Sequence, residues 1–158
     1  AVAFGLDHIV VDTGPQHAQG PSLFTDQTAL DRGIPAITTE TGKSGSNDPY
    51  WVGLAERGIW NVLRHLDMIA EDEVVNTGIT WLSDYRVIKS THSGIFRAVT
   101  KDGYSVAEGA VLGVLLDFFG DELTTIRAPF SGVVNYVIST PPVNEGEPVA
   151  MISKVVER

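Results

Sequence analysis

The chain has 158 residues, 43% of them hydrophobic, and is long enough to bury a hydrophobic core. Its 20 acidic residues outnumber its 11 basic residues and give a net charge of -9, which disfavours nucleic acid as a partner. No apolar run reaches the roughly 18 residues of a membrane span, so no membrane partner is expected. The chain has no cysteine, which excludes disulfides and thiolate metal ligands and is consistent with a cytoplasmic location.

The first part of the chain alternates strand-like and helix-like segments. HIVVD, residues 8–12, predicts a strand, and SLFTDQTALDRG, residues 22–33, predicts a helix with Ser22 as its N-cap and Gly33 as its stop. The next segment, IPAITTE at 34–40, is a nearly continuous apolar run of the kind found in buried strands of parallel sheets. This order of segments predicts an α/β fold.

A lone carboxylate, Glu40, ends this predicted strand and is followed by TG. Ligands of α/β proteins usually bind at the carboxyl ends of the strands, so Glu40 is a candidate for chemistry. The alternative is that Glu40 only caps a turn or faces solvent.

A longer helix is predicted to follow. Asp48 can cap its start and Pro49 suits its first turn. Gly58, inside this helix, indicates close packing against a neighbour, because a helical glycine costs about 1 kcal/mol relative to alanine. Apolar residues recur at helical spacing and are expected to bury one face, namely Val52, Ala55, Ile59, Val62, Leu63, Leu66 and Ile69.

The second part of the chain, residues 73–158, is rich in strand-like segments and contains an internal repeat. SGIFRAV at 93–99 is echoed by SGVVNYV at 131–137, and VAEGAVLGVL at 106–115 by VNEGEPVAMI at 143–152. Two half-units of short strands that cannot bury their apolar faces alone would pack into one small barrel or sandwich. The piece between them, LDFFGDELTTIRAP, predicts a hairpin with a Gly-Asp turn.

The repeat resembles the barrel-sandwich fold of biotinyl and lipoyl carrier domains. Those domains carry their cofactor on a lysine at a hairpin tip, and the corresponding tip falls at Gly120, Asp121 and Glu122. Asp121 stands roughly where the modified lysine would be, and an aspartate cannot form that amide. The sequence therefore predicts the carrier fold without the carrier chemistry.

A resemblance that covers nearly the whole chain rests on five motifs in a fixed order: GIPAITTETG, ERGIWNVLRHLDMI, SGIFRA, VAEGAVLG and IRAPFSGVV. Together they resemble the carboxyl-terminal half of the succinylglutamate desuccinylase and aspartoacylase family. The resemblance implies an α/β fold class, with residues 1–72 as part of a zinc-carboxypeptidase-like catalytic layer and residues 73–158 as a β barrel-sandwich domain. It also implies hydrolysis of the amide bond of an N-acyl amino acid.

By this resemblance Glu40 corresponds to the catalytic glutamate that faces zinc. A zinc ion with an open position polarises water and a carbonyl group, and a nearby glutamate can move the water's proton to the leaving amine. The family's zinc ligands, an H-x-x-E pair and a later histidine, belong to its amino-terminal half. The chain also starts with Ala1. We therefore expect a fragment that lacks the amino-terminal half, holds no metal site of its own and is inactive alone.

The four histidines, His8, His17, His65 and His92, show no metal-ligand spacing. His17 and Lys43 are candidate substrate contacts, although both also suit a solvated loop. A second reading, a non-catalytic binding or carrier-like module built on the repeat, stays open at this point. The sequence does not decide the oligomeric state, and a homo-oligomer is compatible with it.

Overall fold

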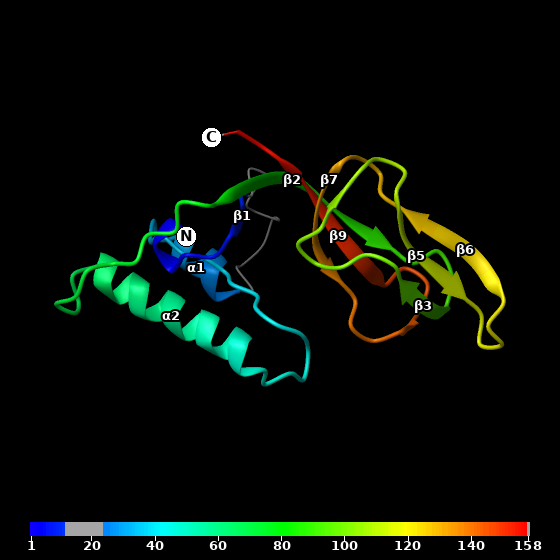
Figure 1. The fold of residues 1–158 in the computed structure, drawn as a ribbon, viewed down its shortest axis with the longest axis horizontal. Coiled ribbons are helices and arrows are strands. Elements are labelled where there is room, and N and C mark those ends of the chain that lie inside the picture. The colour runs from blue at the N-terminus through cyan, green and yellow to red at the C-terminus, as the bar shows by residue number, and fades with distance from the viewer. Residues whose placement is uncertain (12–23, 158) are drawn as a thin grey trace. The chain divides into compact units, whose positions relative to one another are not determined.

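The computed structural model describes residues 1–11 and 24–157, and these residues form a mixed α/β fold of two compact units (Figure 1). The first unit spans Ala1–Ile79 and the second starts at Thr80. The predicted boundary at residue 72 differs from this division. The segment after residue 72 stays with the first unit because Val74 and Asn76 form hydrogen bonds to other residues of that unit.

The described part of the first unit contains a 3-10 helix, one short strand and two α-helices. They are η1 (Val2–Phe4), β1 (His8–Val10), α1 (Thr25–Leu30) and α2 (Pro49–His65). The strand predicted at 8–12 is confirmed by β1. The predicted stop of the first helix is also confirmed, because Gly33 has a φ of 71° and the Ile34 N–H reaches back to the carbonyl of Ala29.

The start of α2 follows the prediction. The Asp48 carboxylate accepts a hydrogen bond of 2.9 Å from the Tyr50 N–H, and Pro49 occupies the first helical position. Close packing at Gly58 is confirmed too, since a Cβ there would lie 2.2 Å from the ring of Phe4. Phe4 of η1 therefore sits directly against the helix backbone.

Two expectations for the first unit are wrong. Residues 34–40 form no strand, because a strand requires a hydrogen-bonded neighbour and none of the described residues pairs with them. The apolar face of α2 is not buried: Val52, Ile59 and Leu66 each expose more than half of their surface. Among the described residues, every buried hydrophobic side chain lies in the second unit.

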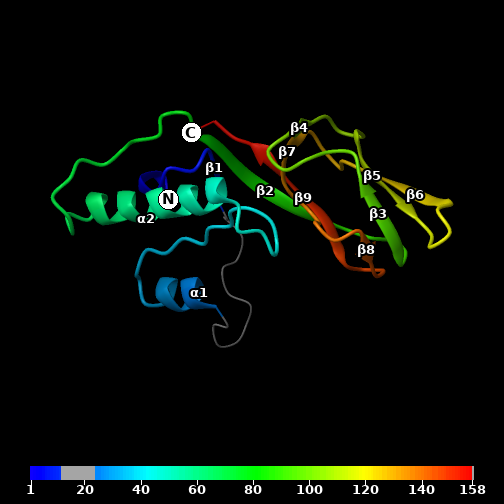
Figure 2. The ribbon, with the colours of Figure 1, turned by 60° about the horizontal axis from the view of Figure 1, so that its bottom comes forward.

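The second unit consists of eight strands in two antiparallel sheets (Figure 2). One sheet contains β2 (Thr80–Lys89), β9 (Pro148–Val155), β7 (Gly132–Val137) and β4 (Ser105–Val106), in that order. The other contains β6 (Glu122–Arg127), β5 (Val111–Leu116), β3 (Gly94–Ala98) and β8 (Pro142–Val143). The core contains Phe96, Leu112, Leu115, Ile126, Ala128, Val134, Val143, Val149, Ala150 and Ile152.

The internal repeat is visible in the strand pairing. Exchanging β2, β3, β4 and β5 with β6, β7, β8 and β9 converts the order of one sheet into that of the other. The same exchange also relates two hydrogen bonds made by equivalent serines. The Ser131 hydroxyl accepts from the Glu108 N–H, and the Ser93 hydroxyl accepts from the Glu145 N–H. The predicted correspondence between residues 93–99 and 131–137 is thus confirmed.

The predicted hairpin is also present as β5 and β6, joined by Asp117–Asp121. The Asp117 carboxylate accepts hydrogen bonds from the N–H groups of Phe119 and Asp121, at 2.8 and 2.9 Å. Gly120 takes a φ of 97°, which favours glycine. Asp121 lies in the turn as expected, whereas Glu122 is already the first residue of β6.

At two repeat-related glycines the backbone of a neighbouring strand leaves no room for a side chain. A Cβ at Gly94 would lie 2.2 Å from the carbonyl oxygen of Leu116, and a Cβ at Gly132 would lie 2.2 Å from that of Ser153. Backbone atoms cannot move aside as a side chain can. A side chain at either position therefore requires the strands to separate.

We expect Gly94→Ala and Gly132→Ala each to destabilise the second unit by about 1–3 kcal/mol, the usual cost of overpacking. Urea denaturation followed by the amide NMR signals of β3, β5, β7 and β9 measures this. Gly78→Ala is the control, because its Cβ would meet only the Asn76 side chain, at 3.5 Å. Two glycine variants as stable as this control would contradict the steric explanation.

Candidate functional site

Glu40 lies at the end of an extended segment that runs from Ile34 to Glu40 on the surface of the first unit. Its side chain is exposed, as are those of Ile34 and Ile37, which expose 53% and 43% of their surface. The apolar run before Glu40 is therefore uncovered, contrary to the expectation of a buried strand. Glu40 is accessible, and the next residue, Thr41, lines a groove along α2.

One side-chain contact fixes the segment before Glu40. The Thr38 hydroxyl donates a hydrogen bond of 2.7 Å to the carboxylate of Asp26, in the first turn of α1. This bond, with a second one from the Gln27 N–H, lowers the pKa of Asp26 below its ordinary value. Thr38 therefore connects the segment that carries Glu40 to α1.

The groove beside this segment is apolar and follows the face of α2 that the sequence predicted to be buried. It has a volume of about 700 Å³. The residues that line it are Thr41, Ser46, Trp51, Val52, Ala55, Glu56, Ile59, Trp60 and Leu63. Both tryptophans and most aliphatic residues of α2 line this groove, and Thr41, the residue after Glu40, lines it too.

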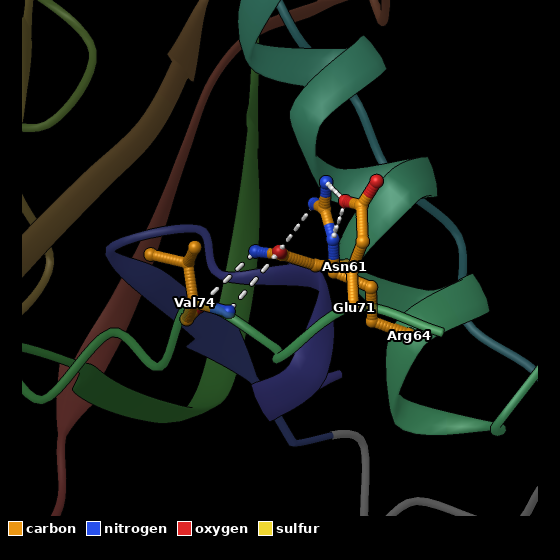
Figure 3. A network of polar contacts seen from close by, with 4 residues as sticks. All are labelled: Asn61, Arg64, Glu71 and Val74. Atoms are coloured by element: carbon orange, nitrogen blue, oxygen red, sulfur yellow. Dashed lines mark hydrogen bonds and ion pairs between the residues drawn. The ribbon is translucent and has the colours of Figure 1, made fainter. Parts of the chain in front are cut away.

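The opposite side of α2 is held by a polar network that the sequence analysis missed (Figure 3). Asn61 is only 7% exposed; its amide donates to the Val74 carbonyl at 3.1 Å and accepts from the Val74 N–H at 3.3 Å. Arg64 donates to Asn61 and to Glu71. Asn61 thus ties Val74 to α2, and Arg64 ties Glu71 to it. In the sequence, this network was indicated only by the position of Asn61 among the apolar residues of the helix.

Within the described ranges, no hydrogen bond or ion pair joins Glu40 to Lys43, His65 or His92. Lys43 is exposed in the loop before α2, where its backbone carbonyl accepts a hydrogen bond from the Ser46 N–H. His17 lies outside the described residues. His65 contacts Glu73 at 2.9 Å and His92 contacts Thr91 at 3.0 Å.

The described residues, 1–11 and 24–157, contain no group of three or more histidine, aspartate or glutamate side chains that could hold a metal ion. His8 lies in β1, His65 ends α2 and His92 lies in the loop between β2 and β3. His65 contacts Glu73, and His92 contacts the adjacent Thr91. These residues therefore do not fit a zinc site by themselves. No helix within the described ranges is long and apolar enough to cross a membrane.

Comparison with known proteins gives one curated relative of similar sequence. N-alpha-acetyl-L-2,4-diaminobutyric acid deacetylase of Halomonas elongata is 30% identical over 166 residues, which correspond to 99% of this chain and 46% of the relative. No protein-family model matches the chain. The chain spans about half the length of the curated relative that it matches.

Solved structures match nearly the whole chain. The apo structure of the ectoine utilization protein EutE (DoeB) from Ruegeria pomeroyi gives a TM-score of 0.85 at 22% identity and covers 97% of this chain and 48% of that one. A succinylglutamate desuccinylase/aspartoacylase from Rhodobacter sphaeroides gives 0.84 at 22% identity and covers 100% and 48%. The chain has the fold of this family, over about half of a member's length. The resemblance expected from the five motifs is confirmed.

The contact between Thr38 and Asp26 leads to a pH-dependent prediction. Because the pKa of Asp26 is lowered in the folded protein, its contribution to stability is present above the unfolded pKa and is lost as the pH falls through the folded pKa. Thr38→Val removes the main cause and should raise the Asp26 pKa towards its ordinary value. An NMR titration of the Asp26 carboxyl measures it.

Thr39→Val is the matched control, since the neighbouring Thr39 has no hydrogen bond to Asp26 in the structure. An unchanged Asp26 titration in Thr38→Val, or the same shift in both variants, would mean that Thr38 does not hold the segment in solution.

Proposed function

We propose that the chain is part of a deacylase that hydrolyses the amide bond of an N-acyl amino acid. The observation that carries this proposal is the 30% identity, over 99% of the chain, to a protein named as a deacetylase of N-alpha-acetyl-L-2,4-diaminobutyric acid. The match in fold to proteins named succinylglutamate desuccinylase/aspartoacylase supports it. These names describe different acyl and amino-acid groups, so the proposal is limited to the N-acyl amino acid class.

We propose Glu40 as the general acid and base of this reaction. Its carboxylate would take a proton from the attacking water and later deliver it to the nitrogen of the leaving amine. Accessibility supports this role, because Glu40 is exposed beside the α2 groove. Lys43, in the same stretch of chain, and His17 are proposed substrate contacts, suited by charge or hydrogen bonding to a carboxylate group.

The other half of the enzyme is the proposed partner of the first unit. We propose that the first unit is part of a zinc-carboxypeptidase-like layer and that the second unit has a barrel-sandwich fold. The first unit leaves apolar side chains of α2 and of residues 34–40 exposed, whereas the second unit has a complete core of its own. An apolar surface of this kind suits burial against a further layer of the same domain. The zinc ligands are proposed to lie in that layer.

Glu40→Gln in the full-length protein tests the catalytic role. The substitution keeps the size of the side chain but removes its proton transfer, so turnover should fall by about 10²- to 10⁴-fold with zinc content and melting temperature unchanged. The assay is amine release from a panel of N-acyl amino acids. Glu56→Gln is the matched control, an exposed glutamate that lines the same groove. Turnover within a few-fold of wild type would remove Glu40 from the mechanism.

Metal analysis after dialysis against a weak chelator tests the division of the site. We expect the 158-residue chain to hold no stoichiometric zinc and the full-length protein to hold it, because the described residues of the chain offer no ligand cluster. Stoichiometric zinc in the isolated chain would place the ligands here instead. Absence of zinc from an active full-length protein would contradict the zinc proposal altogether.

A further inference from the structure

Strand β6 is the end strand of its sheet in the second unit. Among the strands of this unit it pairs only with β5, and both ribbon views place it at the rim of the sheet (Figures 1 and 2). An end strand presents unpaired N–H and C=O groups to which another strand can add. Its central residues Thr124, Thr125 and Ile126 contain no proline, lysine or bulge that would block such pairing.

The hydrogen bonds of Ala128 tell which backbone groups of β6 face outward. The Ala128 N–H donates to the Ala110 carbonyl at 2.9 Å, and the Ala128 carbonyl accepts from the Gly109 N–H at 2.8 Å. The direction of the backbone N–H and C=O groups alternates along an antiparallel strand. Those of Ile126 therefore also point towards β5, whereas those of Thr125 and Arg127 point away from it. The open side of β6 therefore offers the backbone groups of two alternate residues.

A bulge decides which side chains share the outer face of the sheet. Thr124 pairs with Leu115 and Glu122 pairs with Leu116, so Leu123 is an extra residue in β6. The bulge brings Glu122 to the face of Thr125, whose hydroxyl donates a hydrogen bond of 2.8 Å to the Glu122 carboxylate.

Arg127 is on this face as well, two residues beyond Thr125, while Ile126 between them is buried in the core. The outer face of β6 thus carries an acid, a hydroxyl and a base, at equal spacing along the strand once the extra residue is allowed for.

We propose that β6 pairs antiparallel with β6 of a second copy of this chain and joins the two sheets into one. A two-fold axis perpendicular to the sheet then passes between Thr125 and the partner's Thr125, which exchange backbone hydrogen bonds. Glu122 lies opposite the partner's Arg127, and Arg127 lies opposite the partner's Glu122. The strand is complementary to itself, as a symmetric dimer interface requires.

The charges favour this occupant and this register. A shift of the pairing by two residues in either direction separates both charge pairs, so a single register keeps them. The net charge of -9 opposes association between copies in general, and these two pairs place opposite charges at the one line of closest approach.

The hairpin tip adds apolar surface to the same contact. Phe118 and Phe119 expose 73% and 95% of their surface and lie in the turn that leads into β6. In an antiparallel pair each tip extends beyond the partner's Arg127, so four phenylalanines flank the paired strands. Strand pairing alone buries little area, and these rings supply the apolar area that a stable interface needs.

Analytical ultracentrifugation of the 158-residue chain across the micromolar range tests the proposal, and it does not depend on any enzyme activity. We expect a monomer–dimer equilibrium in the wild type. Thr125→Pro removes an outward N–H that β5 does not use, a place where an end strand tolerates proline. It should keep the fold, checked by amide NMR signals of β5, and raise the dimer dissociation constant about tenfold or more.

Charge reversal gives the sharper test. Arg127→Glu and Glu122→Arg should each weaken the dimer about tenfold, and the double variant should restore it to within a few-fold of the wild type. Rescue is specific, because Arg127→Glu alone also loses an internal bond to the Gly109 carbonyl that the double variant does not recover. Lys101→Glu makes the same change in net charge as Arg127→Glu, at an exposed position outside β6, and should leave the dimer unchanged.

A monomeric wild type overturns the proposal. So does association that persists in Thr125→Pro and in both single reversals, since it would then proceed through another surface, such as the apolar groove of α2. Failure of the double variant to recover would exclude the proposed register and with it the proposed interface.

Discussion

The second unit depends on the close approach of backbone to backbone at two glycines. At Gly94 and at Gly132 a carbonyl oxygen of the neighbouring strand occupies the place where a side chain would begin. This contact brings β3 against β5 and β7 against β9, the strands that supply most of the buried core residues. Because the two sites are related by the repeat, one steric requirement applied twice defines both sheets.

The first unit is organised on a different principle. Its described residues bury no hydrophobic side chain. Besides the packing of Phe4 on Gly58, hydrogen bonds hold its elements together. Asp48 caps α2, Asn61 ties Val74 to the helix, and Thr38 connects the segment before Glu40 to α1. Such contacts fix local geometry but contribute little net stability each, typically about 0.5–1.5 kcal/mol. The proposed role of Glu40 therefore relies on a surface that the proposed amino-terminal half would complete.

The features that local chemistry decides were predictable from the sequence. The cap at Asp48, the stop at Gly33 and the hairpin with Asp121 in its turn each depend on a few neighbouring residues, and the repeat follows from sequence similarity between the two halves. The glycine in a helix predicted tight packing at position 58, but not that its partner would be the distant Phe4. The predicted strand at 34–40 and the buried face of α2 failed for one reason. Apolar periodicity reports which side chains need cover, but the cover itself comes from other parts of a structure.

The site was predictable only in part, because its members are distant in the sequence. Glu40 stood out as an acid after an apolar run, whereas Thr38 and Asn61 gave weak signals: a threonine among β-branched residues and an asparagine among apolar ones. Their partners, Asp26 and Val74, lie twelve and thirteen positions away in the sequence. Only the folded chain brings such pairs together.

The contact between Phe4 and Gly58 has a consequence for how the sequence can vary. The ring of Phe4 occupies the space that a Cβ at residue 58 would need, because such a Cβ would lie 2.2 to 2.5 Å from three atoms of the ring. The two positions therefore share one fixed volume, although 54 positions separate them in the chain. Among homologues of this protein a larger residue at position 58 should appear together with a smaller one at position 4, so that the two columns of an alignment covary.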